Sequence, residues 1–153
     1  MIDIIAIDPG LMSGVAHVHV GPNLERTVLS TAELGARDTG EWLAARLAPF
    51  AAAGTLGDVG VVAERFMITN KTAQNSQAPW SLQVLGQSQW ILWQVAPERE
   101  LILQSPADAK TAFTNPRLRE LGLWHRGGKG HALDALRHAA LALHRLKLIS
   151  PSA

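Results

Sequence analysis

The sequence predicts an α/β fold in which a mixed five-stranded sheet is flanked by helices. Segments rich in β-branched and apolar residues alternate with segments of helical periodicity along the chain. The first three strand-like segments follow one another closely, as in a meander, whereas the later ones are separated by helices. With 153 residues, 47% of them hydrophobic, and no internal repeat or linker, the chain fits one domain over residues 1–153. We expect its last few residues to be disordered.

The first part of the chain contains three predicted strands. Residues 2–8 (IDIIAID) are apolar enough for a central strand, and they end at the turn signal Pro9-Gly10. Residues 13–20 (SGVAHVHV) alternate between apolar and polar, as a hairpin partner does. A third short strand is predicted over 24–31.

A helix and a second buried strand come next. Ser30, Thr31 and Asp38 are the candidate N-caps of a helix predicted over 39–52. Two glycines end that helix. Residues 59–66 (VGVVAERF) then form a strongly apolar strand that ends in charged residues.

The second half of the chain is predicted to be mainly helical. Residues 67–79 are predicted to be a polar loop or lid, residues 79–95 a long helix and residues 101–104 a short strand. Ser105 is the predicted N-cap of a short helix that follows it. Residues 114–130 are a basic, glycine-rich region, and residues 131–146 are predicted to form a final amphipathic helix. The glycine-rich stretch 127–130 (GGKG) does not match a Walker A loop, which leaves a flexible phosphate-approaching loop or a plain turn.

Composition excludes several classes of protein. The chain has no cysteine, which rules out disulfides and thiolate zinc sites and permits a reducing, cytoplasmic setting. No apolar run reaches the roughly 20 residues that a membrane span needs, and the amino-terminal segment predicts a buried strand instead of a signal peptide. The part from Pro116 onward carries seven basic and two acidic residues, a net +5, against −4 for the remainder. This asymmetry fits either a polyanion-binding face or an ordinary solvated helix.

Two acids stand at the ends of apolar strands. Asp8 closes the strand IIAID, and Glu64 closes the strand VGVVAE. A carboxylate at the end of a buried strand is unfavourable unless it is paired or binds a cation. Each acid alone would be explained as a turn cap, but together they predict a site if the two strands are neighbours.

The final helix adds a second pair of candidate ligands. His131 and Asp134 are three residues apart and therefore share one helical face. With Asp8 and Glu64 they make three carboxylates and one imidazole, a ligand set that suits Mg²⁺ or Mn²⁺. Arg137 and His138 lie one turn further, where each could orient an acid or contact phosphate, or be plain surface.

These elements resemble those of the RuvC-type Holliday junction resolvases. The resemblance lies in Asp8-Pro9-Gly10 before a glycine-containing second strand, in Glu64 at a later strand end, and in the final helix reading GHALDALRHA. It covers residues 2 to about 146 and is closest to the compact versions found in bacteriophages. The resemblance implies a ribonuclease H-like fold, a homodimer, and divalent-metal cleavage of two opposed strands of a four-way DNA junction.

Site residues follow from the resemblance by position. Asp8, Glu64 and Asp134 match the family's acids, and His131 stands where many members have a fourth aspartate. Catalysis would use two Mg²⁺ or Mn²⁺ ions, bridged by Asp8, and leave a 5′-phosphate and a 3′-hydroxyl. Because imidazole is softer than carboxylate, His131 should favour Mn²⁺.

DNA contacts and the dimer interface are predicted more loosely. Phe66 is the candidate wedge at the junction centre, with a core residue as the alternative. The apolar helix over 79–95 is the candidate dimer interface, with full burial inside the monomer as the alternative. Basic residues predicted to approach DNA are Lys71, Lys110, Arg126, Lys129 and Arg137.

Three other functions compete with junction resolution. A nuclease of this fold that cuts flaps, forks or other branched DNA is the strongest, since substrate choice depends on loops and dimer geometry. A nucleotide-binding lobe of the actin type would need a second lobe. A DNA-binding protein without activity is disfavoured by the intact set of ligand-type residues.

Overall fold

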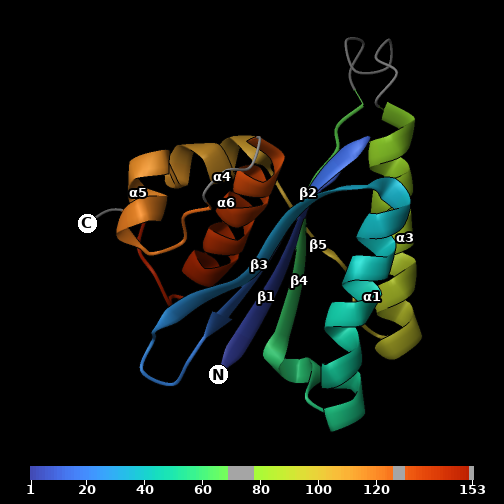
Figure 1. Cartoon of the computed structure of the whole chain (residues 1–153), viewed down its shortest axis with the longest axis horizontal. Helices are drawn as coiled ribbons and strands as arrows, with labels where there is room; N and C mark the ends of the chain where they lie inside the picture. The colour runs from blue at the N-terminus through green and yellow to red at the C-terminus, as the bar shows by residue number, and fades with distance from the viewer. Residues whose placement is uncertain (69–77, 126–129, 152–153) are drawn as a thin grey trace.

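Five strands form one mixed sheet in the computed structural model, which describes residues 1–68, 78–125 and 130–151 (Figure 1). They stand in the order β3-β2-β1-β4-β5, with bounds Ile2–Asp8 (β1), Met12–Val20 (β2), Arg26–Gly35 (β3), Val59–Glu64 (β4) and Ile102–Gln104 (β5). The first three strands are antiparallel to one another, whereas β4 runs parallel to β1 and β5 parallel to β4. The predicted five-stranded mixed sheet is confirmed, with β1 at its centre.

Helices cover both faces of the sheet (Figure 1). Helices α1 and α3 pack together on one face, while α4, α5 and α6 lie on the other. Their bounds are Ala36–Ala53 (α1), Ala78–Val95 (α3), Pro106–Ala112 (α4), Asn115–Glu120 (α5) and Gly130–Arg145 (α6), with a short 3₁₀ turn, η1, at Leu56–Asp58. None of the helices that the structure describes combines the length and apolar character needed to cross a membrane.

Alternation along β1 decides which residues meet which helices. Ile4 and Ala6 point toward α6 and its neighbours, whereas Ile5 and Ile7 point toward α1 and α3. All four side chains are at most 1% exposed, so β1 is buried on both faces. The same alternation puts the even-numbered Asp8 on the α6 face of the sheet.

The region from β3 to α1 differs from the prediction. The third strand is longer than 24–31, and the helix begins at Ala36 instead of residue 39. The predicted N-caps Ser30 and Thr31 are wrong, because both lie within β3, where the ladder with β2 continues to Gly35. The actual N-cap is Gly35, which offers no side chain, and Asp38 lies in the first turn, where the helix dipole favours an acid.

Helix α5 and the end of β4 also differ from the prediction. The helix α5 falls within the stretch 114–130, whose proline, basic residues and glycines predicted no helix. Pro116 lies in the first turn of α5, where its missing N–H costs nothing, and Leu118 anchors the helix in the core. The strand predicted over 59–66 ends at Glu64, so Phe66 stands beyond it and is half-buried. Ser105 does cap α4, accepting a hydrogen bond from the Asp108 N–H at 3.4 Å.

Candidate active site

Three strand ends supply polar side chains on the face that α6 covers. Asp8 ends β1, Glu64 ends β4 and Gln104 ends β5, and the parallel register pairs Glu64 with Gln104. Asp8 and Glu64 stand two positions after Ala6 and Val62, which face α6 in the core, and Gln104 contacts His138 of α6. The chain therefore directs two carboxylates and one carboxamide toward the same helix.

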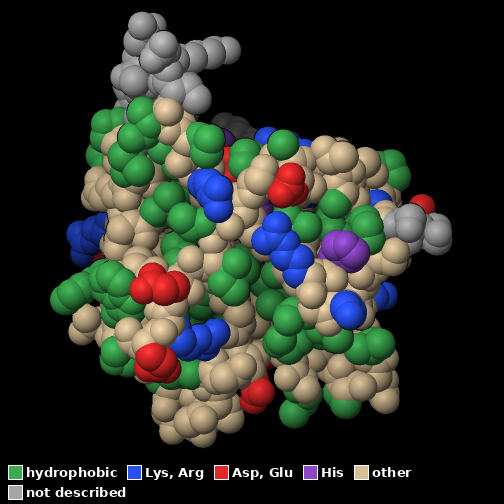
Figure 2. Space-filling view, turned by 180° about the vertical axis from the view of Figure 1, so that it is seen from behind, with side chains coloured by type: hydrophobic (Ala, Val, Ile, Leu, Met, Phe, Trp, Pro, Cys, Tyr) green, Lys and Arg blue, Asp and Glu red, His purple; other side chains and the backbone are tan. Residues whose placement is uncertain are grey.

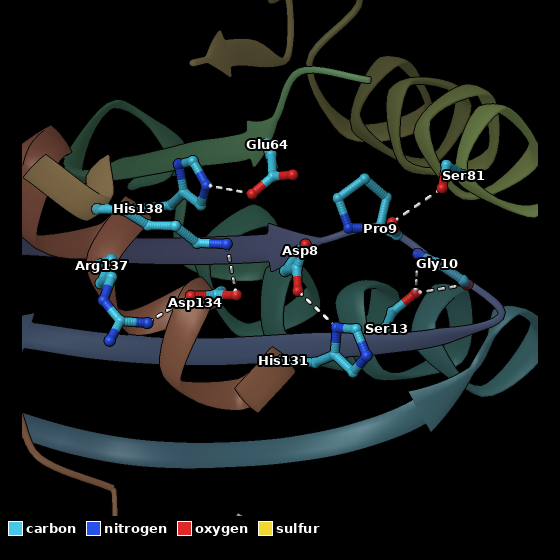
Figure 3. A network of polar contacts seen from close by, with 11 residues as sticks. Asp8, Pro9, Gly10, Ser13, Glu64, Ser81, His131, Asp134, Arg137 and His138 are labelled. Atoms are coloured by element: carbon cyan, nitrogen blue, oxygen red, sulfur yellow. Dashed lines mark hydrogen bonds and ion pairs between the residues drawn. The ribbon is translucent and has the colours of Figure 1, made fainter. Parts of the chain in front are cut away.

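Helix α6 brings His131 against Asp8 (Figure 3). The imidazole Nδ1 lies 2.8 Å from Asp8 Oδ2, an ion pair when the ring is protonated. This approach depends on Gly14, which pairs with Asp8 in β2: a Cβ there would lie 1.9 Å from the carbonyl oxygen of His131. Only glycine lets the start of α6 come this close to the sheet. The His131 side chain is half exposed, at 52%.

Two cationic side chains hold Asp134. Lys110 of α4 places its Nζ 3.2 Å from Asp134 Oδ2, and the Arg137 guanidinium pairs with Oδ1. Arg137 is itself anchored, since it donates to the carbonyl of Phe113 at 3.1 Å and to Asn115. The carboxylate is mostly buried, at 17% exposed, so these two cations offset much of its charge.

Glu64 is held by His138 of α6. His138 Nε2 lies 3.1 Å from Glu64 Oε2, and its Nδ1 lies 2.9 Å from Gln104 Oε1. The imidazole is 1% exposed, so its predicted alternative as a surface residue is wrong. Its other predicted role, orienting an acid, agrees with this contact.

The electrostatics of the site centre on Asp8. Burial raises the pKa of its carboxyl from 3.8 to about 6; the hydrogen bond from His131 lowers this pKa, and the neighbouring Glu64 and Asp134 carboxylates raise it further. A charged Asp8 is therefore unfavourable without added positive charge. Such a site favours the binding of a cation.

The turn after Asp8 is fixed by two serines (Figure 3). Ser13 Oγ accepts from the Gly10 N–H and donates to the Gly10 carbonyl, both at 3.2 Å. Ser81 of α3 donates to the Pro9 carbonyl at 3.0 Å. No local sequence pattern marks Ser81, because its partner lies 72 positions away. The turn therefore couples Asp8 to α3 as well as to the sheet.

The predicted ligands converge, and their chemistry fits divalent cations. Asp8, Glu64, Asp134 and His131 come together between β1, β4 and α6, and three of them are hard oxygen donors. Among the residues that the structure describes, no three His, Asp or Glu side chains are arranged to hold a metal as they stand. The ion pairs explain this, since each carboxylate is turned toward a nitrogen partner. The raised pKa of Asp8 supports the fit, because burial and, to a smaller extent, the neighbouring carboxylates disfavour its charged form unless a cation is bound.

The predicted DNA contacts have mixed outcomes. Lys110 and Arg137 lie in the site, on Asp134. Lys71, Arg126 and Lys129 lie outside the described residues, as do the GGK of the glycine-rich loop and residues 152–153. Seen from behind, the surface shows separate Lys and Arg side chains among hydrophobic and neutral ones, without a continuous basic patch on that face (Figure 2).

The fold is of the ribonuclease H type, with carboxylates ending β1 and β4 and a further one on the last helix. Two solved structures from Thermus thermophilus share it. RuvC in complex with a Holliday junction substrate has a TM-score of 0.73 at 18% identity, with 98% of each chain covered. A second RuvC structure has a TM-score of 0.67 at 19% identity, covering 97% of this chain and 99% of the other.

Sequence comparison adds no further relative. A scan against protein-family models finds no match, and a search of curated proteins finds none either. The likeness to RuvC therefore rests on structure and shows the fold, as the resemblance in the sequence implied.

Proposed function

We propose that this chain is a divalent-metal-dependent endonuclease that resolves four-way DNA junctions. The observation that carries the proposal is the meeting of Asp8, Glu64, Asp134 and His131 at one point of a fold shared with a junction-bound RuvC. On this reading residues 1–153 are one nuclease domain. Its work would lie in the cytoplasm of a bacterium or an infected host, and a phage origin stays a prediction.

The site residues divide the work of phosphodiester hydrolysis. Bound Mg²⁺ or Mn²⁺, two ions in our proposal, supplies positive charge for the attacking and leaving oxygens. Asp8, Glu64, Asp134 and His131 would be the residues that hold these ions. Water would attack phosphorus in line and give up a proton as the new P–O bond forms, while the bond to the 3′-oxygen breaks and that oxygen takes up a proton; the products would be a 5′-phosphate and a 3′-hydroxyl.

Lys110 and Arg137 would change partners when the site is loaded. Both cations now neutralise Asp134, and Lys110 is 55% exposed at the edge of the site. Once Asp134 faces bound metal, the Lys110 ammonium becomes available to a DNA phosphate. Lys71, Arg126 and Lys129 remain further proposed contacts, and Phe66 remains the proposed wedge at the branch point.

The Asp8→Asn variant tests the proposal. Cleavage of a synthetic four-way junction with Mn²⁺ should fall by at least about 10²–10³-fold, the loss expected on removing one group that stabilises developing charge. Junction binding in EDTA should persist. The matched control is Asp58→Asn, which replaces an exposed aspartate at the end of η1, just before β4, and should cleave normally. Full activity of Asp8→Asn would contradict the mechanism.

The metal preference has its own test. Replacing His131 by Asp should lower the ratio of Mn²⁺-supported to Mg²⁺-supported cleavage, because the softer nitrogen ligand is lost. An unchanged ratio would exclude His131 as the source of the preference.

A homodimer through α3 belongs to the same proposal. The helix buries Val84 and Leu92 but leaves Trp80 (39% exposed), Leu82 (46%), Trp90 (61%) and Trp93 (40%) on its surface. Four large apolar side chains on one helix are typical of an interface. Light scattering should therefore give twice the 16.5 kDa chain mass, and Trp90→Glu should give monomer.

The control for this test is Leu29→Glu, which places the same charge on an exposed apolar residue of β3. It should stay dimeric. A wild-type monomer at micromolar concentration would refute the dimer.

Cleavage of flaps or forks is the second candidate function, because this fold alone does not fix the DNA substrate. A panel of junction, flap, fork and duplex substrates with mapped cuts distinguishes the two. Symmetric cuts on opposed junction strands support resolution, whereas single cuts near a branch support the alternative.

A further inference from the structure

His138 is out of place in the buried face of α6. The other buried residues of this helix are all Ala or Leu: Ala132, Ala135, Leu136, Ala139, Ala140, Leu141, Ala142 and Leu143. A buried imidazole needs partners for both ring nitrogens, which a leucine at the same position would not. Packing alone therefore does not explain His138.

Both ring nitrogens have partners, and the partners come from two neighbouring strands. Nε2 faces Glu64 Oε2 of β4 at 3.1 Å, and Nδ1 faces the Gln104 carboxamide of β5 at 2.9 Å. An ionised carboxylate can only accept, so Nε2 must carry the proton in this contact. Glu64 has three rotatable bonds and is 22% exposed, and this contact fixes one of its two oxygens.

The Gln104 carboxamide can determine which ring nitrogen of His138 carries the proton. Its Nε2 is buried and has no hydrogen-bond partner among the residues that the structure describes, while its Oε1 faces His138. A half-turn of the carboxamide would direct the NH₂ group at Nδ1. Nδ1 would then accept from Gln104, and Nε2–H would donate to Glu64. In this arrangement one ring nitrogen accepts and the other donates, as a neutral imidazole requires.

We propose that His138 is a positioning residue, held by Gln104 as the Nε2–H tautomer, that fixes one oxygen of Glu64 and leaves the other to face the metal site. This inference rests on the proposed function, since it assigns Glu64 a cation to bind. Groups that orient a metal ligand typically contribute about 10–100-fold to metal affinity or activity.

Mn²⁺ binding without DNA is the first test, measured by electron paramagnetic resonance or calorimetry on the full chain. His138→Leu removes the donor but fills the space, and should weaken Mn²⁺ binding and junction cleavage by about 10–100-fold. His138→Gln, whose NH₂ can reach Glu64, should recover most of both. Gln104→Leu should give a smaller loss.

His144→Leu is the matched control. It removes a partly buried histidine of the same helix that contacts the Ile149 carbonyl, far from Glu64 along α6, and should leave Mn²⁺ binding unchanged. Equal Mn²⁺ binding by wild type and His138→Leu would overturn the inference. So would a loss in His138→Gln as large as in His138→Leu, with melting temperature falling in parallel in both.

A measurement on the wild-type protein keeps the inference testable if the variants do not fold. Proton–nitrogen correlation spectra should show the proton of His138 on Nε2, with a nitrogen shift that moves in Glu64→Gln. A bare Nε2 would overturn the inference. Failure of the proposed function is separate: a wild type that binds Mn²⁺ but cuts no branched DNA removes the nuclease and leaves the orientation of Glu64 by His138 standing.

Discussion

Strand β1 carries an aspartate near each end, and the two are equally buried but differently surrounded. Asp3 is 6% exposed and Asp8 7%. Asp3 faces α1 and α3, and two imidazoles of β2 hydrogen-bond to its carboxylate. His17 Nε2 lies 2.8 Å from Oδ1, and His19 Nδ1 lies 3.0 Å from Oδ2. Asp8 faces α6, has one imidazole partner and lies near two other carboxylates.

The difference teaches that burial alone does not mark a functional acid. The Asp3 carboxylate is satisfied by donors fixed in the neighbouring strand, an arrangement that stabilises the folded chain. Asp8 lacks such a set of donors: burial, and to a smaller extent the neighbouring Glu64 and Asp134 carboxylates, raises its pKa to about 6, which favours the binding of a cation. The satisfied acid and the candidate site thus lie at opposite ends and on opposite faces of one strand.

The largest expected effect is that asparagine substitutions at the two ends of β1 change the free energy of unfolding in opposite directions. Asp3→Asn should destabilise the metal-free protein at pH 7 by about 1–3 kcal/mol, because two charge-assisted hydrogen bonds weaken. Asp8→Asn should stabilise it by about 2–3 kcal/mol, because a carboxyl of pKa about 6 is charged at an unfavourable site. Urea unfolding in EDTA measures both, and shifts of the same sign would remove the distinction.

Gly14→Ala tests the site end without touching an acid. The added Cβ would overlap the carbonyl of His131, so α6 must move away from β2 at a cost of about 1–3 kcal/mol. Junction cleavage should fall with it, because His131 and Asp134 move with the helix. Gly57→Ala at the far end is the control, since a Cβ there meets no atom within 4 Å. Normal cleavage by Gly14→Ala would show that the close approach is dispensable.

Protonation of His17, which contacts Asp3, should lower the stability of the folded chain at acidic pH. Burial lowers the pKa of His17 below 6.5, although the hydrogen bond and charge of Asp3 act to raise it. The unfolded chain therefore binds the proton more readily, so this part of the stability is present above pH 6.5 and is lost as the pH falls below it. His17→Asn should flatten the decline by at most about 1.4 kcal/mol per pH unit, the limit for one proton.

This measurement is best made in the Asp8→Asn background. The raised pKa of Asp8 acts in the opposite direction, adding stability as the pH falls from about 6 toward 3.8. An identical pH profile for His17→Asn and its parent would contradict the assignment.

The smallest expected effect concerns the turn that links Asp8 to α3. Ser81→Ala removes the hydrogen bond to the Pro9 carbonyl and should cost about 1 kcal/mol. Cleavage should fall only slightly, since Ser13 still holds Gly10. A loss of cleavage as large as in Gly14→Ala would mean that α3 controls the position of Asp8.

The sheet and the four site residues could be predicted because they leave local signals. Apolar runs that end in Asp8 and Glu64 are visible without a structure, and the spacing of His131 and Asp134 follows from helical periodicity. The Asp3 cluster was missed, although Asp3 pairs directly with His19 in the register of β1 and β2. That signal was available once the hairpin was predicted.

Other features depend on contacts between distant segments. Gln104 can be placed beside Glu64 only when the parallel register of β4 and β5 is known. The ladder that extends β3 over Ser30 and Thr31 overrides their capping preference, and the burial of Leu118 makes a helix of a proline-containing stretch. Tertiary packing, which no local window contains, decides these elements.

The close approach at Gly14 has a consequence for genetics. A random mutational screen for loss of function should recover substitutions at this codon as readily as at the codons for the acids. Such alleles would still encode every candidate site residue. Their defect would come from the single methyl group that replaces a hydrogen atom at residue 14 and keeps α6 from packing against β2. A search for reactive side chains would not identify this position.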